Sequence, residues 1–241
     1  MESVQGLTAL ITGASGGIGS AIAGKFSSLG IRLALLGRSE EKLRNTERTV
    51  RQNGVECITL AGDLLDDDYL RRSVEKTAEH FGSVDIVVNN AGMALSCPFE
   101  KTATEQFDRI MALNCRAPFV MCQTALPYLR QSQHPTIINI ASVNAHKGYV
   151  LQSAYSASKH ALAGFTKALA AEVYQQGIRV HMISPGGVFT DMVRISRPDL
   201  TGQGMILAED VAEVAAFLLT HRTNAVIDEV QMHRVGKEPF L

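Results

Sequence analysis

Short apolar runs alternate with longer stretches of helical spacing along this chain. The apolar runs, rich in β-branched and aliphatic side chains, lie at Leu7–Thr12, Arg32–Leu36, Cys57–Ala61, Ile86–Asn89, Thr136–Ile140, Val180–Ile183 and Ala225–Met232. The helical stretches lie at roughly Gly17–Leu29, Glu40–Asn53, Asp67–Phe81, Thr104–Leu129, Ala154–Gln175 and Ala208–Leu219. Runs that are apolar at nearly every position are typical of strands covered on both faces, and strand–helix alternation favours right-handed βαβ units. The pattern predicts an α/β fold: a doubly wound, seven-stranded parallel sheet with helices on both faces.

Length, composition and charge narrow the class of protein. The chain has 241 residues, 46% of them hydrophobic and 20% charged, so one domain spanning residues 1–241 is expected. Lys and Arg number 23 against 24 Asp and Glu, and this balance argues against nucleic acid or a membrane surface as partner. The sequence shows no secretory signal or spanning segment, which predicts a cytoplasmic protein. The four cysteines lack metal-ligand spacing, so free thiols and no metal site are expected.

A glycine-rich segment follows the first predicted strand. In doubly wound, Rossmann-type sheets, ligands bind beyond the carboxyl ends of the strands, and here Thr12–Gly19 reads TGASGGIG before a helix. Glycines let backbone approach a phosphate closely, and a helix N-terminus offers free N–H groups. The spacing is looser than the Gly-x-Gly-x-x-Gly fingerprint, so a tight turn is the alternative. Its position favours a nucleotide pyrophosphate, contacted by Gly13, Ser15, Gly17, Ile18 and Gly19.

The second predicted strand ends in Gly37-Arg38-Ser39, without a carboxylate. An acid is expected near this point in proteins that bind the ribose of NAD, whereas an Arg can bind the 2′-phosphate of NADP. We therefore expect Arg38 and Ser39 to contact the cofactor, with NADP(H) preferred and NAD(H) possible. Two alternatives stay open: Arg38 as a solvated loop residue, and Glu40 or Glu41 as the ribose acid.

Polar and small residues follow the third and fourth strands as well. Asp63, next to Leu64, is placed to accept a hydrogen bond from an adenine amino group, although a loop or capping Asp is nearly as common. Asn90, Ala91 and Gly92 are small or polar where backbone must run close to a cofactor. We expect all five to contact the nucleotide.

The candidate catalytic residues follow the fifth strand. Ser142 comes directly after it, and Tyr155 and Lys159 lie four residues apart on one face of the next helix. A free tyrosine has a pKa of about 10, and a neighbouring cation favours the phenolate, which brings proton exchange toward neutral pH. Taken singly, a Tyr and a Lys at this spacing are usually surface residues. Together with Ser142 at a nucleotide cleft, they predict proton-transfer chemistry.

Taken together, these residues make the chain resemble the short-chain dehydrogenase/reductase family. The resemblance covers essentially the whole length of the chain. The matching segments are Thr12–Gly19, Asp63, Asn89–Gly92, Asn114, Ser142, Tyr155–Lys159 and Pro185-Gly186. The resemblance implies that Tyr155 is the proton donor and acceptor, and that Ser142 binds the substrate oxygen. It also implies that Lys159 binds the nicotinamide ribose and lowers the Tyr155 pKa, and that Asn114 holds a water of the proton relay.

The resemblance also implies which residues lie beside the nicotinamide ring and that the protein forms an oligomer. Pro185, Gly186, Val188 and Thr190 would line the nicotinamide. The irregular periodicity of the residues that follow, with Pro198 and two glycines, predicts a lid over the substrate at about 188–206. Arg194 and Arg197 in that lid are read as solvated loop residues, with contact to a substrate anion as the alternative. Helices at Thr104–Leu129 and Ala154–Gln175 would form a four-helix interface, which predicts a homo-oligomer, either a tetramer or a dimer.

Pro118 lies four residues after Asn114 inside a helical pattern. Because proline has no N–H, the Asn114 carbonyl loses its helical donor and the helix is expected to bend there. A freed carbonyl can bind an ordered water, which supports the relay; a plain bend that improves packing is the alternative.

The chemistry predicted is that of an NADP-dependent oxidoreductase that interconverts a carbonyl and a secondary alcohol of a small molecule. A 3-hydroxy acid or a ketoacyl compound is the first guess. The final strand, Asn224–Val230, lacks the Thr-Gly usual in ketoacyl reductases of the family. A 3-oxoacyl thioester reductase and a catalytically silent NAD(P)-sensing protein remain the alternatives, and the presence of both Tyr155 and Lys159 argues against the second.

Overall fold

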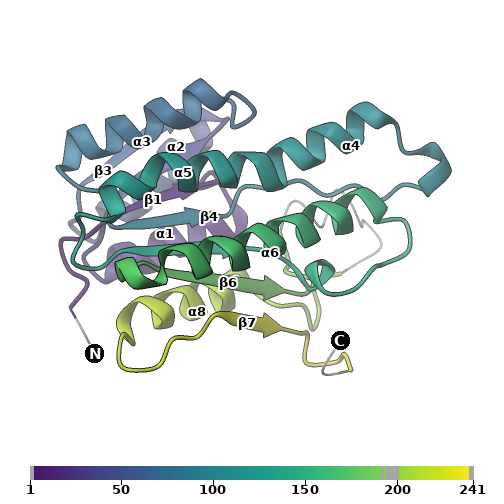
Figure 1. Cartoon of the computed structure of the whole chain (residues 1–241). Coiled ribbons are helices and arrows are strands. Elements are labelled where there is room, and N and C mark those ends of the chain that lie inside the picture. Colours follow the sequence, from purple (N-terminus) through teal and green to yellow (C-terminus); the bar gives the residue numbers. More distant parts are fainter. Residues whose placement is uncertain (1–2, 191–192, 194–200, 239–241) are drawn as a thin grey trace.

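The computed structural model of the protein describes residues 3–190, 193 and 201–238. Within these residues seven strands form one sheet in the order β3-β2-β1-β4-β5-β6-β7, and every neighbouring pair is parallel (Figure 1). The strands are β1 Thr8–Thr12, β2 Arg32–Gly37, β3 Cys57–Ala61, β4 Ile86–Asn89, β5 Thr136–Ile140, β6 Arg179–Pro185 and β7 Glu229–Met232. The predicted fold class is confirmed.

Helices cover both faces of this sheet. They are α1 Gly17–Ser28, α2 Glu40–Arg51, α3 Asp67–Phe81, α4 Thr104–Met111, α5 Ala117–Leu129, α6 Ser153–Val173 and α8 Ala208–Thr220. Short 3₁₀ turns lie at η1 Phe99–Lys101, η3 Val143–Ala145 and η4 Tyr174–Gln176, and a π turn, η2, at Ala112–Arg116. Side chains of α1, α2 and α8 pack in one apolar cluster, and those of α3 and α5 in another. No helix of the described residues is long and apolar enough to cross a bilayer.

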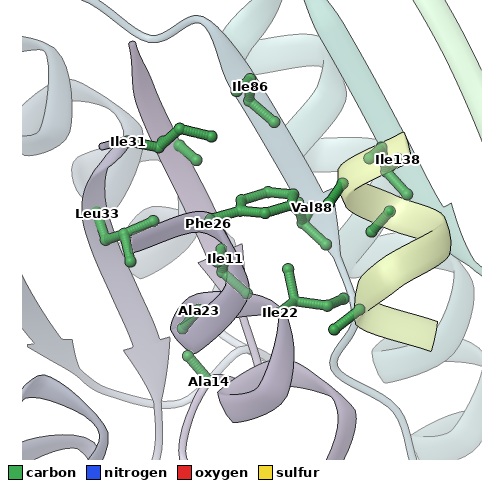
Figure 2. Packing of buried hydrophobic residues seen from close by; sticks show 14 of the residues in the cluster. Ile11, Ala14, Ile22, Ala23, Phe26, Ile31, Leu33, Ile86, Val88 and Ile138 are labelled. Atoms are coloured by element: carbon green, nitrogen blue, oxygen red, sulfur yellow. The ribbon is translucent and has the colours of Figure 1, made fainter. Parts of the chain in front are cut away.

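The strand interiors explain why the apolar runs show no alternation. Ile11 and Val88 point into the cluster with α1 and α8, whereas their neighbours Leu10 and Val87 point into the opposite cluster, and all four are fully buried. Figure 2 shows Phe26 of α1 packed among the side chains on the face of the sheet that α1 and α8 cover. Because successive strand side chains alternate between faces, a sheet covered on both sides requires an apolar residue at each position.

The predicted helix at Thr104–Leu129 is in fact three segments. α4 ends at Met111, the π turn η2 carries Asn114 at its centre, and α5 begins at Ala117 with Pro118 in its first turn. The Ala117 N–H donates to the carbonyl of Ala112, five residues earlier. The interruption lies where Pro118 removes an N–H donor, and it takes the form of a π turn.

The final strand is shorter than predicted. The predicted run began at Ala225, but β7 pairs with β6 only from Glu229, which lies opposite Met182. Val226 and Ile227 are exposed, at 50% and 39%, because they lie before the edge strand β7 and are not part of the sheet. Their β-branched side chains gave a strand pattern without burial to match it.

Candidate active site

A cleft of about 950 Å³ opens at the carboxyl ends of the strands. Segments that follow each of the seven strands contribute to its wall, from Gly13 after β1 to Arg234 after β7. Because all seven strands are parallel, their carboxyl ends point to one side of the molecule, as the arrowheads in Figure 1 show. The cleft therefore lies at the edge of the sheet where ligands bind in doubly wound folds.

Two glycines after β1 are held by contacts with the segment after β4. A Cβ atom on Gly13 would lie 2.9 Å from the Cα of Ala91, and one on Gly19 would lie 2.3 Å from the Gly13 carbonyl oxygen. Asn90 ties the two segments together, since its Nδ2 donates to the carbonyl oxygens of Thr12 at 3.0 Å and Gly13 at 3.2 Å. Neither glycine position has room for a side chain, so the chain can present bare backbone to a ligand here.

The first turn of α1 faces the same cleft. Its N-cap residue, Gly16, has no side chain to cap the helix, and Gly17 and Ile18 line the cleft. Gly17 has a φ of +55°, and a Cβ there would lie 3.2 Å from Cγ2 of Thr190. The uncapped N–H groups and the positive end of the helix dipole suit a pyrophosphate, so this cradle fits a dinucleotide cofactor.

The end of the cleft beside β2 is cationic. Arg38 lines it together with Lys42, and neither side chain has a hydrogen bond or ion pair among the described residues. Glu40 pairs with Arg44 at 2.6 Å, and neither residue lines the cleft. Ser39 caps α2 by accepting from the Lys42 N–H at 3.3 Å, and it does not line the cleft. No local pattern in the sequence marked Lys42, the third residue of α2.

Asp63 and Leu64 line the cleft after β3. Asp63 is exposed, and its Oδ1 accepts a hydrogen bond from the Leu65 N–H at 3.1 Å, so one carboxylate oxygen stabilises the local loop. Leu64 is buried, at 5% exposure, and forms an apolar part of the wall. Asp63 can stabilise its loop and bind a ligand at the same time, because its second carboxylate oxygen has no partner among the described residues.

Ser142 is buried at the end of β5 and is fixed by Asn144. Its Oγ accepts from the Asn144 N–H at 3.2 Å and donates to Asn144 Oδ1 at 3.3 Å. The Asn144 Nδ2 in turn donates to Gln152 Oε1 at 2.8 Å and to Ser156 Oγ at 3.0 Å. This chain of hydrogen bonds joins Ser142 to the start of α6, the helix that carries the tyrosine. The sequence analysis missed Asn144.

Tyr155 and Lys159 both line the cleft, one turn apart on α6. Lys159 is only 4% exposed; its Nζ donates to the Ile140 carbonyl at 2.9 Å and lies 5.8 Å from the Tyr155 ring centroid. Burial lowers the Lys159 pKa to about 8, because an ammonium is poorly solvated there. Burial also raises the Tyr155 pKa, and the hydrogen bond with Ser142 only partly opposes this shift. Desolvation of the phenolate dominates this shift, and Lys159 is not among its causes, so the lowering of the Tyr155 pKa by Lys159 stays a prediction.

Asn114 lies behind the wall of the cleft and is fully buried. Its Oδ1 accepts from the Met93 N–H at 2.8 Å, and its Nδ2 donates to the Met93 carbonyl at 2.9 Å and to Ser158 Oγ at 2.9 Å. A Cβ on Gly92 would lie 3.2 Å from Asn114 Oδ1 and 3.7 Å from Lys159 Nζ. The Asn114 side chain thus joins the segment after β4 to α6, close to Lys159; the water that its carbonyl would hold stays a prediction.

Most of the predicted site residues lie on one continuous wall. Those that line the cleft are Gly13, Ser15, Gly17, Ile18, Arg38, Asp63, Leu64, Asn90, Ala91, Gly92, Ser142, Tyr155, Lys159, Pro185, Gly186, Val188 and Thr190. Gly19, Ser39 and Asn114 do not line it. Lining residues that the sequence analysis missed include Lys42, Arg109, Gln152, Arg234 and Lys237. The last two follow an edge strand, where no local pattern marks a ligand site.

The predicted lid lies only partly within the described residues. At its two ends, Val188 pairs with Ile206 in an isolated parallel bridge, and the Phe189 N–H donates to the Ile206 carbonyl at 2.9 Å. Residues 191–192 and 194–200 lie outside the described residues, so the predictions for Arg194 and Arg197 fall there. Among the residues that are described, no cluster of His, Cys, Asp and Glu could hold a metal ion, and the four cysteines are free thiols.

Comparisons with known proteins agree with this geometry. The family model for short chain dehydrogenases matches residues 7–201. The 2-(R)-hydroxypropyl-CoM dehydrogenase of Xanthobacter autotrophicus is 36% identical over 201 residues, which cover 81% of this chain and 80% of that protein.

Two solved structures show the same architecture. A metagenomic short-chain oxidoreductase in complex with NADP superposes with a TM-score of 0.85 at 33% identity, over 97% of this chain and 99% of that one. A short-chain dehydrogenase from Mycobacterium paratuberculosis bound to NAD gives 0.86 at 26% identity, over 97% of each chain. With the family model matched over most of its length, the chain belongs to the short-chain dehydrogenase/reductase family and is an NAD(P)-dependent oxidoreductase that acts on alcohols and carbonyls.

Proposed function

We propose that this protein uses NADP(H) to interconvert a carbonyl and a secondary alcohol, with Tyr155 as the general acid and base. One observation carries the proposal: Ser142, Tyr155 and Lys159 line the same cleft as the glycine-rich cradle of β1 and α1. A hydroxyl, a phenol and an ammonium beside a dinucleotide site are the groups that a carbonyl reduction needs, since the oxygen must be held and then protonated.

Ser142 and Tyr155 act on the substrate oxygen. In the direction of reduction, NADPH would supply the hydride for the carbonyl carbon when bound, and negative charge would then develop on the carbonyl oxygen. The Ser142 hydroxyl turns its single proton from Asn144 Oδ1 to that oxygen, and the Tyr155 phenol transfers its proton to it.

Lys159 has donors to spare. An ammonium has three N–H donors, and one of them is directed to the Ile140 carbonyl at 2.9 Å. The other two are free to bind the hydroxyls of a nicotinamide ribose and to stabilise the phenolate left on Tyr155 after proton transfer. A pKa of about 8 also allows Lys159 to return a proton to Tyr155 near neutral pH.

The preference for NADP(H) rests on Arg38 and Lys42. Both cations line the end of the cleft beside β2, and Glu40 is held by Arg44. A 2′-phosphate adds negative charge that a guanidinium can bind with paired hydrogen bonds, whereas the unphosphorylated ribose of NAD is better served by a carboxylate.

The test is an assay of NADPH and NADH oxidation with small ketones, 3-oxo acids and 3-oxoacyl thioesters. We expect turnover of part of the panel, with a higher kcat/KM for NADPH than for NADH. Preferred turnover of the thioesters would favour the 3-oxoacyl thioester reductase. Tight NADPH binding without turnover of any compound would overturn the proposal in favour of a nucleotide sensor.

We further propose that the protein is a homo-oligomer, a dimer or a tetramer. Phe107 of α4 and Phe119 of α5 are exposed, at 38% and 52%. The Phe119 ring packs edge-on against the Phe165 ring of α6, with 5.8 Å between the ring centroids. Exposed aromatic rings on neighbouring helices are typical of surfaces that a partner covers. Sedimentation equilibrium should give a mass of two or four chains, and a monomer would refute this.

A further inference from the structure

The charged side chains that line the cleft are mostly cationic, whereas the chain as a whole is nearly neutral. The formal net charge of the whole protein is −1. Among the described residues that line the cleft, Asp63 is the single acid, and the cationic side chains are Arg38, Lys42, Arg109, Lys159, Arg234 and Lys237. Arg38, Lys42 and Lys159 already have a role in the proposed cofactor site. The cations that follow β7 do not.

Arg234 is built into the wall by the segment after β6. The Gly186 N–H donates to the Met232 carbonyl at 2.7 Å, which holds the end of β7 against that segment. A Cβ on Gly187 would lie 3.7 Å from Arg234 Nε, so the guanidinium side chain lies directly over that glycine. The Lys237 N–H donates to the Arg234 carbonyl at 2.9 Å and turns the chain so that Lys237 also lines the cleft.

The Arg234 side chain is half-buried and has no hydrogen bond or ion pair with any described residue. Glu229, the acid of the same strand, does not neutralise it, because that carboxylate binds His146 at 2.5 Å and accepts from Ser184 Oγ at 2.8 Å. A half-buried guanidinium without an anion has lost hydration without gaining a partner. Its five N–H donors are therefore available to an anion in the cleft.

The cofactor phosphate sites follow strands that are distant from β7 in the sheet. The proposed 2′-phosphate site follows β2 and the pyrophosphate site follows β1, which lie five and four strands away from β7 in the sheet. At about 4.8 Å between neighbouring strands, these separations are on the order of 24 and 19 Å. Arg234 instead lies one strand beyond β6 and two beyond β5, whose following residue is Ser142. This is the substrate end of the cleft.

We propose that Arg234 binds an anionic group on the substrate, so that the preferred substrates are ketones and alcohols that carry a carboxylate, phosphonate or sulfonate. The inference rests on the proposed function and adds the substrate class to it. The planar guanidinium can bind two oxygens of such a group at once, which fixes the carbonyl relative to Ser142 and Tyr155. Lys237, which is exposed, adds attraction at longer range.

The test uses ketones of one shape that differ in charge. Acetoacetate, acetonylphosphonate and acetonylsulfonate carry the three anionic groups, and acetoacetamide is the neutral counterpart of acetoacetate. The kcat/KM of the protein is measured for each with saturating NADPH. We expect at least one anion to exceed acetoacetamide by about tenfold or more, the effect of one charge-assisted hydrogen bond. The anion with the highest value identifies which group the site prefers.

Arg234→Ala tests the residue. The ratio of kcat/KM for the preferred anion to that for acetoacetamide should fall about 10- to 100-fold, mainly through KM, and Arg234→Lys should recover part of it. Arg71→Ala is the matched control, since Arg71 is exposed on α3 without a side-chain partner among the described residues, and it should leave the ratio unchanged.

The outcomes separate this inference from the function on which it rests. Equal kcat/KM for the anions and the amide, or an Arg234→Ala ratio equal to that of the unmodified protein, overturns the inference while the oxidoreductase proposal stands. A loss of NADPH affinity in Arg234→Ala as large as the loss for the anion overturns it too, because Arg234 would then serve the cofactor. No turnover of any ketone overturns both.

Discussion

The two ends of the cleft are built from different groups: one mainly from backbone, the other from side chains. The part that follows β1 is made mainly of backbone: Gly13 and Gly19 have no room for a Cβ, and the first turn of α1 offers uncapped N–H groups. The end that follows β5 is made of side chains, among them Ser142 and Lys159, both buried and each held by a hydrogen bond.

This difference determines how each end can be damaged. A backbone site is destroyed by an added methyl group but is indifferent to most neighbouring side chains. A side-chain site depends on the identity of single groups, and it carries the free-energy cost of burying them. The predictions below test each half of this contrast, beginning with the largest expected effect.

Tyr155→Phe removes only the phenolic oxygen from the catalytic end. Without a proton donor at the substrate oxygen, kcat should fall by about 10²- to 10⁴-fold, the usual effect of losing a general acid. NADPH affinity, measured by fluorescence titration, should be kept, since the ring remains. Tyr174→Phe is the control, because Tyr174 is 66% exposed and lies outside the cleft. A Tyr155→Phe variant with preserved turnover would remove Tyr155 from proton transfer.

Lys159→Met tests the cost of burial at the same end. The folded-state pKa of Lys159 is about 8 against 10.5 for the free group, so between these pH values the unfolded chain binds more protons than the folded one. The contribution of Lys159 to the free energy of unfolding therefore rises as the pH increases from 8 to 10.5 and is least favourable below pH 8. The full change amounts to about 3 kcal/mol.

Urea unfolding of Lys159→Met and the unmodified protein between pH 7 and 10.5 measures this. Stability of the unmodified protein relative to the variant should increase by a few kcal/mol over that range. Lys167→Met, at an exposed position of α6, should show no such change. A pH-independent difference for Lys159→Met would contradict the argument.

Gly19→Ala tests the backbone end. The new methyl group would lie 2.3 Å from the Gly13 carbonyl oxygen and 2.5 Å from Asn90 Nδ2, so the glycine-rich segment must move. We expect a loss of stability of about 1–3 kcal/mol, as for other overpacked sites, together with weaker NADPH binding. Gly24→Ala on the same helix has no atom within 4 Å of its Cβ and should instead stabilise the protein by about 0.5–1 kcal/mol. Equal effects of the two variants, in thermal unfolding and NADPH titration, would contradict this.

Arg38→Ala is expected to have the smallest effect, because the side chain is exposed and other contacts remain. The Kd for NADPH should increase about tenfold while that for NADH changes little, since the lost partner is the 2′-phosphate. Lys42→Ala should act in the same direction with a smaller effect. Arg71→Ala, at an exposed position of α3 without a side-chain partner among the described residues, is the control. Equal weakening of NADPH and NADH would refute the assignment.

The sequence predicted the periodic and local features of this protein well. The strand runs and the order of elements follow from side-chain periodicity, and the bounds of β1, β3, β4 and β5 differ from the prediction by no more than one residue. The glycine-rich segment and the Tyr155–Lys159 spacing are local signals, so they could be found without coordinates. The predicted Ala225 start of β7 was wrong because a β-branched run also occurs on an exposed edge.

Features that depend on several segments could not be predicted in this way. The strength and direction of the Tyr155 pKa shift depend on burial under other elements, and the Lys42 and Arg234 side chains reach the cleft only because of where α2 and β7 lie. Asn144 positions Ser142 through hydrogen bonds to two residues of a later segment, and no spacing rule marks such a contact.

The amino-acid sequence by itself determined the sheet, the bare backbone for a phosphate and the identity of the hydroxyl, phenol and ammonium, because periodicity and glycine spacing act over a few residues. Only the tertiary structure decided which charges share the cleft and how water is excluded from them. Electrostatic interactions and desolvation depend on distances through space, and parallel strands bring together residues that are far apart along the chain.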